Sequence, residues 1–518
     1  MGIEKFGVLR CHRSIASLGG LKPKGDVVAK SDKMFICFKR GGNGRLIGAK
    51  TGTDPETAKA FDEKADDEFN FESTDHQKDG DGAAKDNTED EDLSDLTVGR
   101  VCYSTLSSVD ASISPYHQLI ELTTIFRHGL QSAGLEGQIY GFVKDNGSEV
   151  ESGEDFETYE ITQEHLTVIH KHLFDMKEVD EGMKILPSSI LLSLVATFDS
   201  IVGDFARQLL TLNPTKLESS EKTISYRELF NLSDLETTRS RLIDDEISNL
   251  LRGSHKKQAE YLEALIETKI VAHYERWPNF IEIFERRNAY AHNNGFASEE
   301  YLKKVEQAKY PTKDLSLGNH LQLSTSYLHK SVDILTEFLT ILSFVAWRKL
   351  GDDPSEAFSA VSFAAYTHIT KRRFLLAIKL LDFALHRQPR DGVSDRTLRQ
   401  MYVNLANAYK KKGESEKCKS VLKELDWSAT SLDFKICLAS LNEDAEEVCK
   451  LLPNAVSSGD IQKNDIRDWP VFDWIREDEK VREAFRVAFG EPLVEPSDSA
   501  PQNLPESFKS EASEKSVH

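Results

Sequence analysis

The sequence predicts a mainly α-helical protein with a small β or α+β module near its N-terminal end. Two observations indicate the helices. From about 157 to 350, apolar residues recur at the three- and four-residue spacing that places them on one face of a helix. From 351 to 490, a helix–turn–helix pattern repeats with a period of roughly 34 residues. A β-leaning run at 34–38, followed by the turn-forming letters KRGGNGR and by Leu46 and Ile47, predicts a hairpin.

Composition and charge limit the classes of function. The chain has 518 residues, of which 39% are hydrophobic and 29% charged, which is typical of a soluble globular protein with some disordered segments. The formal net charge of -21 excludes strong long-range attraction to bulk nucleic acid or to an anionic membrane. Any contact with a polyanion therefore has to use a local basic patch.

Cysteine usage and hydropathy predict a cytoplasmic protein that makes no use of a membrane. The six cysteines are scattered and form no C-x-x-C pair, which favours free thiols in a reducing compartment. The first residues, MGIEKFGVLRCHRS, contain no apolar signal-peptide core. The strongly apolar segment 334–347 is interrupted by Thr336, Glu337, Thr340 and Ser343, so we expect a core helix and not a membrane span.

The N-terminal third is predicted to be one module divided by an acidic insert. Residues 1–55 lean towards β structure, and 99–156 continue the module with a helix at 116–126 and a strand at 138–143. Between these two parts, 56–98 are acidic and have few apolar residues, which predicts a disordered linker. The alternative is a polyanion mimic that shields a basic surface of the same protein.

Four long segments between 157 and 350 have the pattern of amphipathic helices. They cover 186–212, 226–266, a segment that begins near 277 and is closed by the stretch 285–295, and 321–350, and a shorter lead-in helix is expected at 163–176. Long amphipathic helices with short connections favour an antiparallel bundle. The apolar face of the 186–212 helix is formed by Leu191, Leu194, Val195, Phe198, Ile201, Val202, Phe205 and Leu209.

Residues 351–490 resemble degenerate tetratricopeptide repeats. In these repeats small residues let paired helices approach closely and stack. Two departures from the repeat pattern stand in the first unit, where His368 and Arg372 replace the usual aromatic residue and glycine. The resemblance implies a surface for a protein partner. The segment DWPVFDWIREDEKVREAFRVAF is expected to form a capping helix over the last repeat, and the composition of 491–518, rich in Pro, Ser and Glu, predicts a disordered tail. The residues that match the pattern best are Tyr402, Leu405, Ala406, Ala408, Tyr409, Gly413, Cys418, Leu422 and Leu425.

One stretch, ERRNAYAHNNG at 285–295, combines features that an ordinary helix end does not. At roughly 100° per residue, Phe280, Ile283, Phe284 and Ala291 form one apolar stripe, and Arg287 falls in the middle of it. A permanently charged side chain on a buried face is costly unless a partner compensates it.

A second, polar stripe runs along the same predicted helix. His292 lies roughly 140° from Arg287 and shares a face with Asn288 and Glu285. A purely structural alternative explains both stripes by an Arg–carboxylate pair, a histidine near the negative end of the helix dipole, and Gly295 as the C-cap. The spacing alone does not decide between the structural and the functional interpretation.

The order Arg287-Asn288-x-x-x-His292 resembles the R-x(4–6)-H signature of the HEPN (higher eukaryotes and prokaryotes nucleotide-binding) superfamily. The surrounding run RRNAYAHNNGFASEEYL, which includes Gly295 and Tyr301, is similar to a run in uncharacterised bacterial members. The resemblance covers roughly 185–350, the length expected of a bundle domain. It implies a four-helix bundle and a homodimeric, metal-independent endoribonuclease of a bacterial defence or stress system, with no cofactor and no bound metal.

The resemblance also implies roles for individual side chains. An imidazole can transfer protons near neutral pH, which suits His292 as a general acid or base. A guanidinium is a planar, permanent cation, which suits Arg287 for the phosphoryl oxygens. Asn288 would hold the phosphate or orient His292, and the products would carry a 2′,3′-cyclic phosphate and a 5′-hydroxyl. Glu285 and Asp199 are candidates to fix the arginine or the histidine, and Tyr301 is a further supporting residue.

Three other observations complete the sequence-based hypothesis. Because Arg287 and His292 do not share a face on a regular helix, a composite site requires a distorted helix end or a second subunit. RNA contacts are expected at a local basic patch on the otherwise acidic chain, formed by Arg252, Lys256 and Lys257. Subfamilies that are neutralised by a nucleotidyltransferase carry a tyrosine two places after the motif histidine, and Asn294 stands there instead.

Two rival functions remain open from the sequence. The first is a non-catalytic interaction protein, in which the bundle and the repeats bind a protein partner and Arg287 is structural. The second is a module that senses a nucleotide or another small ligand. Metalloprotease and nucleophile-elbow motifs do not occur in the sequence, so other hydrolase classes have no support.

Overall fold

The computed structural model describes residues 33–40, 46–52, 96–132, 135–153, 156–217 and 234–493. Most of this part of the chain is helical, which confirms the prediction of a mainly α protein. The chain divides into two compact units. The first comprises 1–91, 118–190 and 323–325, and the second comprises 92–117, 191–322 and 326–518. The segments predicted to be disordered lie almost entirely outside the described residues.

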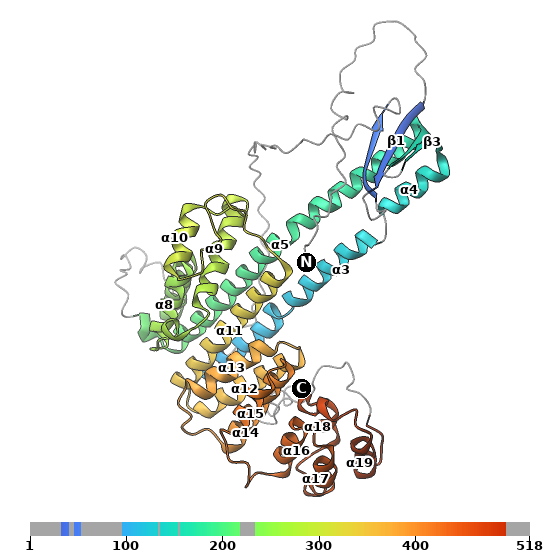
Figure 1. Ribbon diagram of the computed structural model, residues 1–518. Coiled ribbons are helices and arrows are strands. Elements are labelled where there is room, and N and C mark those ends of the chain that lie inside the picture. Colours follow the sequence, from blue (N-terminus) through green and yellow to red (C-terminus); the bar gives the residue numbers. More distant parts are fainter. Residues whose placement is uncertain are drawn as a thin grey trace, which may run out of the picture. The chain divides into compact units, whose positions relative to one another are not determined.

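The first unit contains a four-stranded antiparallel sheet in the order β2-β1-β4-β3 (Figure 1). Its strands are β1 (Lys33–Arg40), β2 (Leu46–Gly52), β3 (Ser148–Ser152) and β4 (Phe156–Thr162). The pairing of β1 with β2 confirms the predicted N-terminal hairpin. Two helices, α4 (Leu135–Asn146) and the first part of α5 (Gln163–Leu212), pack against β4 and form a hydrophobic core. Its buried residues are Ile139 and Val143 of α4, Leu166 and Ile169 of α5, and Tyr159 and Ile161 of β4.

The strand predicted at 138–143 is wrong, because these residues lie inside helix α4 (Leu135–Asn146). Ile139 and Val143 are four residues apart, so both face the sheet from one side of the helix. A short apolar run is compatible with a strand or a buried helix, and periodicity alone does not separate the two. The residues that follow, Asp145 and Asn146, also belong to α4, and the Gly147 N–H donates to the Val143 carbonyl at 2.7 Å at the end of this helix, before β3 begins.

The helices predicted at 163–176 and 186–212 are a single helix, α5 (Gln163–Leu212), which has 50 residues. Pro187 stands inside it, where it removes one backbone hydrogen bond without ending the helix. An 18-residue window within Glu181–Leu212 has a mean hydropathy of 1.8, so this part of α5 is, by length and composition, apolar enough to cross a membrane. Core helices of soluble proteins meet the same criterion, so this is weak evidence, and the expected lack of a membrane span stays a prediction.

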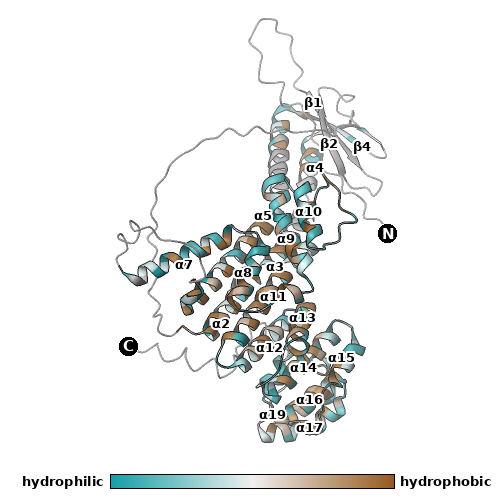
Figure 2. Cartoon of the chain, turned by 90° about the vertical axis from the view of Figure 1, so that its left-hand side faces the viewer, coloured by the Kyte–Doolittle hydropathy of each residue, from teal (hydrophilic) through white to brown (hydrophobic). Residues whose placement is uncertain are grey.

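In the second unit, the C-terminal part of α5 packs with α9 (Trp277–Asn293) and α11 (Thr325–Leu350). The ring of Phe198 on α5 lies 5.7 Å from that of Phe280 and 5.3 Å from that of Phe284, and 6.3 Å from that of Phe338 on α11. In Figure 2, α11 is coloured mainly as hydrophobic, whereas α10 (Glu299–Gln307) is coloured mainly as hydrophilic. These aromatic contacts position the helix that carries the RRNAYAHNNG stretch.

The helix predicted at 226–266 is interrupted. The structure describes this part of the chain from residue 234 and shows α7 (Leu235–Arg252) and α8 (His255–Leu265). Gly253 ends α7 in an extended conformation, and the Ser254 hydroxyl accepts from the Lys257 N–H to cap α8. The break matters because it places His255 at the first position of a new helix.

Helices α12 to α17 form three successive antiparallel pairs (Figure 1). Each turn within a pair contains a residue with positive φ, namely Arg372 (58°), Gly413 (85°) and Glu443 (57°). Arg372 therefore adopts the left-handed conformation at the position where the repeat pattern expects glycine. The identification with tetratricopeptide repeats stays a prediction. The six helices are α12 (Pro354–Thr370), α13 (Phe374–His386), α14 (Asp395–Lys411), α15 (Ser415–Leu422), α16 (Leu432–Leu441) and α17 (Ala445–Ser458).

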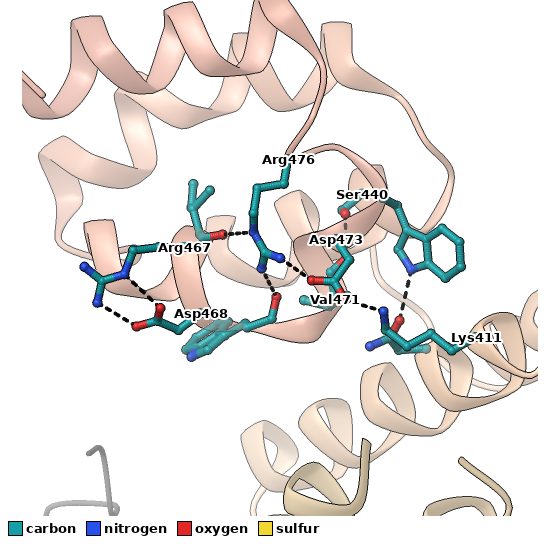
Figure 3. A network of polar contacts seen from close by, with 11 residues as sticks. Lys411, Ser440, Arg467, Asp468, Val471, Asp473 and Arg476 are labelled. Carbon is teal, nitrogen blue, oxygen red and sulfur yellow. Dashed lines mark hydrogen bonds and ion pairs between the residues drawn. The ribbon is translucent and has the colours of Figure 1, made fainter. Parts of the chain in front are cut away.

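The end of the second unit covers the last helix pair with α18 (Lys463–Asp468), the 3-10 helix η6 (Pro470–Trp474) and α19 (Glu479–Phe489). Arg476 organises this segment, since it donates to the carbonyls of Ile466 and Trp469 and pairs with Asp473 (Figure 3). Asp473 also pairs with Lys411 on α14. The polar network therefore ties the C-terminal helices to α14.

Residues 96–117 belong to the second unit, whereas the sequence analysis assigned 99–156 to one N-terminal module. They form α2 (Val98–Ser108), the π-helix η3 (Val109–Ile113) and the start of α3 (Tyr116–Ser132). The Thr97 hydroxyl caps α2, so ordered structure begins just inside the predicted linker 56–98. Arg373 donates to the Ser114 carbonyl at 3.3 Å, which fixes the end of η3 to the first helix pair.

Candidate functional site

The RRNAYAHNNG stretch forms the C-terminal part of α9, which continues without interruption to Asn293. Asn294 and Gly295 then take left-handed conformations, with φ of +49° and +81°. The Gly295 N–H donates to the Ala289 carbonyl at 3.0 Å, which closes the helix end. The α9 helix is thus regular over both motif residues.

The arginine buried in the bundle is Arg286, and not Arg287 as the helical wheel indicated. Arg286 is 7% exposed, and its Nε donates to Glu282 Oε1 at 2.6 Å. Its Nη1 donates to the Gln322 carbonyl at 2.6 Å, and its guanidinium lies 4.1 Å from the centroid of the Tyr327 ring. The Arg286 guanidinium is therefore buried and held by three partners, namely Glu282, the Gln322 carbonyl and the Tyr327 ring.

Tyr301 belongs to the same buried network and not to the motif. Its hydroxyl donates to Glu282 Oε1 at 2.8 Å, and the Tyr327 hydroxyl donates to Glu282 Oε2 at 2.9 Å. Burial, followed by the adjacent Glu282 carboxylate, holds the pKa of Tyr301 well above its usual value. The role of Tyr301 in this structure is to hold α10 against α9.

Arg287 lies at the edge of the bundle with its side chain 24% exposed. Its Nη2 is 3.7 Å from Asp199 Oδ2 on α5. Its Nε is buried and makes no hydrogen bond to any residue in the described part of the chain. Arg287 therefore makes one long ion pair and leaves a buried N–H without a partner among the described residues, in contrast to Arg286.

Asp199 connects Arg287 to a histidine that the sequence analysis did not select. The other carboxylate oxygen, Oδ1, lies 3.0 Å from His255 Nε2. The His255 ring is stacked on Phe284, with centroids 3.5 Å apart and planes inclined by 10°. A weak signal for this histidine exists in the sequence, since His255, Ala259 and Leu262 share one face of α8.

His292, Asn288 and Glu285 lie on the outer side of α9. His292 is exposed and makes no hydrogen bond or ion pair with another residue that the structure describes. Asn288 Nδ2 donates to Glu285 Oε2 at 3.5 Å, and Glu285 pairs with Lys304 at 3.3 Å. Glu285 therefore contacts neither of the two motif residues it was expected to fix.

A single α9 does not bring Arg287 and His292 together. On a regular helix, five residues correspond to a rotation of roughly 140° and a rise of about 7.5 Å. Within one chain, Arg287 instead forms a constellation with Asp199 and His255. His292 of the same chain lies on another face of α9 and does not belong to this constellation.

The three predicted RNA-contact residues lie on the connection that carries His255. Arg252 is the last residue of α7, and Lys256 and Lys257 follow His255 in α8. All three are exposed, and Lys256 pairs only loosely with Glu260, at 3.8 Å. Their cationic groups are thus available to solvent on either side of His255 in the sequence.

Comparison with known proteins adds no further assignment. No family model matches the chain, and no match was found among curated proteins or among solved structures. In the part of the chain that the structure describes, no group of three or more His, Cys, Asp or Glu side chains is arranged to hold a metal ion.

Proposed function

We propose that the protein is a metal-independent endoribonuclease of a bacterial defence or stress system, active as a homodimer. The observation that carries this proposal is the contrast between two adjacent arginines. Arg286 is occupied by Glu282 and by the Gln322 carbonyl. Arg287 is partly exposed and is held only loosely, at 3.7 Å, by Asp199. A guanidinium with unused donors is suited to bind a phosphoryl oxygen.

The reaction is the attack of an RNA 2′-hydroxyl on the adjacent phosphorus. A base takes the 2′-hydroxyl proton as the O2′–P bond forms, and the P–O5′ bond breaks as an acid protonates O5′. The products are a 2′,3′-cyclic phosphate and a 5′-hydroxyl. Arg287 stabilises the charge on the equatorial oxygens, and His292 transfers a proton.

The geometry of α9 supports the proposed dimer. Because Arg287 and His292 lie on different faces, each active site would combine Arg287 of one subunit with His292 of the partner subunit. A two-fold axis produces two equivalent sites of this kind. The exposed Arg252, Lys256 and Lys257 would contact RNA phosphates, which a chain of net charge -21 can attract only locally.

The test is cleavage of total RNA and of a quenched fluorescent RNA oligonucleotide in the presence of a chelator. The wild-type protein is expected to produce 2′,3′-cyclic phosphate ends. His292→Ala and Arg287→Ala are each expected to lower the rate by about 10²-fold or more. His273→Ala, which removes an exposed histidine elsewhere on the surface, is the matched control. Full activity of His292→Ala would exclude the proposed mechanism.

A non-catalytic interaction protein is the second candidate function. The observation that favours it is an apolar groove near the C-terminal end of the second unit. An open groove lies between α17 and α19, and its lining includes Pro453, Val456, Ala484 and Val487. Val487 is 71% exposed, which is unusual for a large apolar side chain. On this alternative His292→Ala leaves every activity unchanged, whereas the double substitution Val456→Asp/Val487→Asp abolishes partner binding.

A further inference from the structure

The two oxygens of the Asp199 carboxylate contact two different side chains, the His255 imidazole and the Arg287 guanidinium. Oδ1 lies 3.0 Å from His255 Nε2, and Oδ2 lies 3.7 Å from Arg287 Nη2. The three residues come from α5, α8 and α9. We infer that His255 is a second acid–base residue of the ribonuclease site, an inference that rests on the proposed function.

The structure fixes the His255 ring more firmly than a surface histidine requires. One edge faces Asp199, and one face is stacked on Phe284, which is itself 1% exposed. Because Nε2 faces a carboxylate oxygen of Asp199, Nε2 is the ring nitrogen that carries a hydrogen in the neutral imidazole. Nδ1 makes no hydrogen bond to any described residue, so this nitrogen is the one available to a substrate.

The three side chains also share partial access to solvent. The side chain of His255 is 10% exposed, that of Asp199 22%, and that of Arg287 24%. The Arg286 side chain on the same helix is 9% exposed, so His255 is nearly as buried as Arg286, whereas Asp199 and Arg287 are more open to solvent. RNA can therefore contact this constellation from the side of Arg287 and Asp199.

Two proton transfers are needed in each cleavage event, and they occur on opposite sides of the phosphorus. The O2′ proton passes to one imidazole as the O2′–P bond forms. The other imidazole, which begins protonated, gives its proton to O5′ as the P–O5′ bond breaks. With His255 beside Arg287 and His292 supplied by the partner subunit, each composite site holds one imidazole for each transfer.

A purely structural role for His255 predicts different behaviour. In that case the contact with Asp199 only ties α8 to α5. Glutamine at position 255 can still donate an amide N–H to Asp199 and cover Phe284, but it cannot transfer a proton. The substitution His255→Gln therefore separates the catalytic role from the structural one.

The experiment measures the pH–rate profile of RNA cleavage by the full-length wild type and by His255→Gln. The wild type is expected to give a bell-shaped profile. His255→Gln is expected to lose one limb of the bell and about 10²- to 10⁴-fold in kcat, with little change in KM or in melting temperature. If the variant is destabilised, His255→Gly with added imidazole replaces it, and partial recovery of cleavage is expected.

The possible outcomes separate this inference from the proposed function. A wild-type rate and profile for His255→Gln, or no rescue of His255→Gly by imidazole, would overturn the role of His255 if Arg287→Ala remains inactive. No cleavage by the wild type, or full activity of Arg287→Ala, would overturn the ribonuclease assignment and this inference with it. As a control, glutamine at the exposed His273, in the variant His273→Gln, is expected to retain the wild-type pH–rate profile.

Discussion

Glu282 and Arg286 lie one turn apart on α9 and form a buried ion pair, with Glu282 Oε1 2.6 Å from Arg286 Nε. The hydroxyls of Tyr301 and Tyr327 donate to the same carboxylate. This pair, and not one at Arg287, is the structural Arg–carboxylate pair of the helix. The neighbouring Arg287 makes only a longer contact, at 3.7 Å, with Asp199.

The two adjacent arginines are expected to differ in their effect on stability. Arg286→Ala leaves Glu282 buried and without its cation, which should cost about 3–5 kcal/mol of unfolding free energy. Arg287→Ala removes a partly exposed contact at 3.7 Å and should cost less than about 1 kcal/mol. Urea unfolding of the two variants checks this difference. Equal destabilisation would favour the alternative in which Arg287 is structural.

The helical wheel indicated the wrong arginine because α9 is buried on two faces. Phe280, Ile283 and Phe284 are buried on the apolar stripe as expected, although Ala291 is exposed. Glu282, Arg286 and Ala289 form a second buried face, which the apolar pattern does not reveal because two of its three residues are charged. The hydroxyls of Tyr301 and Tyr327 contact this second face at Glu282. The helix itself was predictable because its periodicity is strong over 17 residues.

Other differences come from contacts that no local pattern records. His255 and Asp199 are 56 positions apart, and only the packing of α8 on α5 and α9 brings them together. The α4 helix was read as a strand because a short apolar run fits both structures. Pro187 did not end α5, although an interior proline disfavours a helix. For α4, the packing of Ile139 and Val143 against β4 decides in favour of the helix.

Mixed dimers are expected to test the composite site directly. If each site uses Arg287 of one subunit and His292 of the other, a heterodimer of Arg287→Ala with His292→Ala contains one intact site. Random exchange of subunits should then restore about a quarter of the wild-type cleavage rate. The measurement is the rate after mixing, compared with each variant alone. No recovery, despite confirmed subunit exchange, would contradict a site shared between subunits.

Gly295 is expected to tolerate no side chain. Its φ is +81°, and an added Cβ would lie 2.7 Å from the Tyr290 ring and 3.0 Å from His320 Nε2. Gly295→Ala should therefore cost about 1–3 kcal/mol and lower RNA cleavage, since the helix end next to His292 has to shift. Gly318→Ala is the matched control, with φ of +78° and nothing within 4 Å of the added Cβ. Urea unfolding and cleavage rates of both variants check the difference, and equal effects would mean that the close contacts at Gly295 carry no cost.

The stability of the second unit is expected to fall in acid because of His368 on α12. This side chain is 5% exposed, and its Nδ1 has no hydrogen-bond partner among the residues described. Burial, followed by the charges of Arg373 and Lys371, lowers the pKa of His368 from 6.5 to about 3. In the unfolded chain the same imidazole binds a proton below a pH of about 6.5.

Between these two pKa values the unfolded state therefore holds one proton more than the folded state. The free energy of unfolding should decrease as the pH falls from about 6.5 towards 3, by at most about 1.4 kcal/mol per pH unit from this residue. Above pH 6.5 the residue contributes no pH dependence, because both states are neutral. His368→Phe removes the titration and keeps an aromatic ring in the buried position. Urea unfolding between pH 4 and 6 should give a shallower slope for His368→Phe than for the wild type, whereas parallel slopes would show that His368 is protonated in the folded protein.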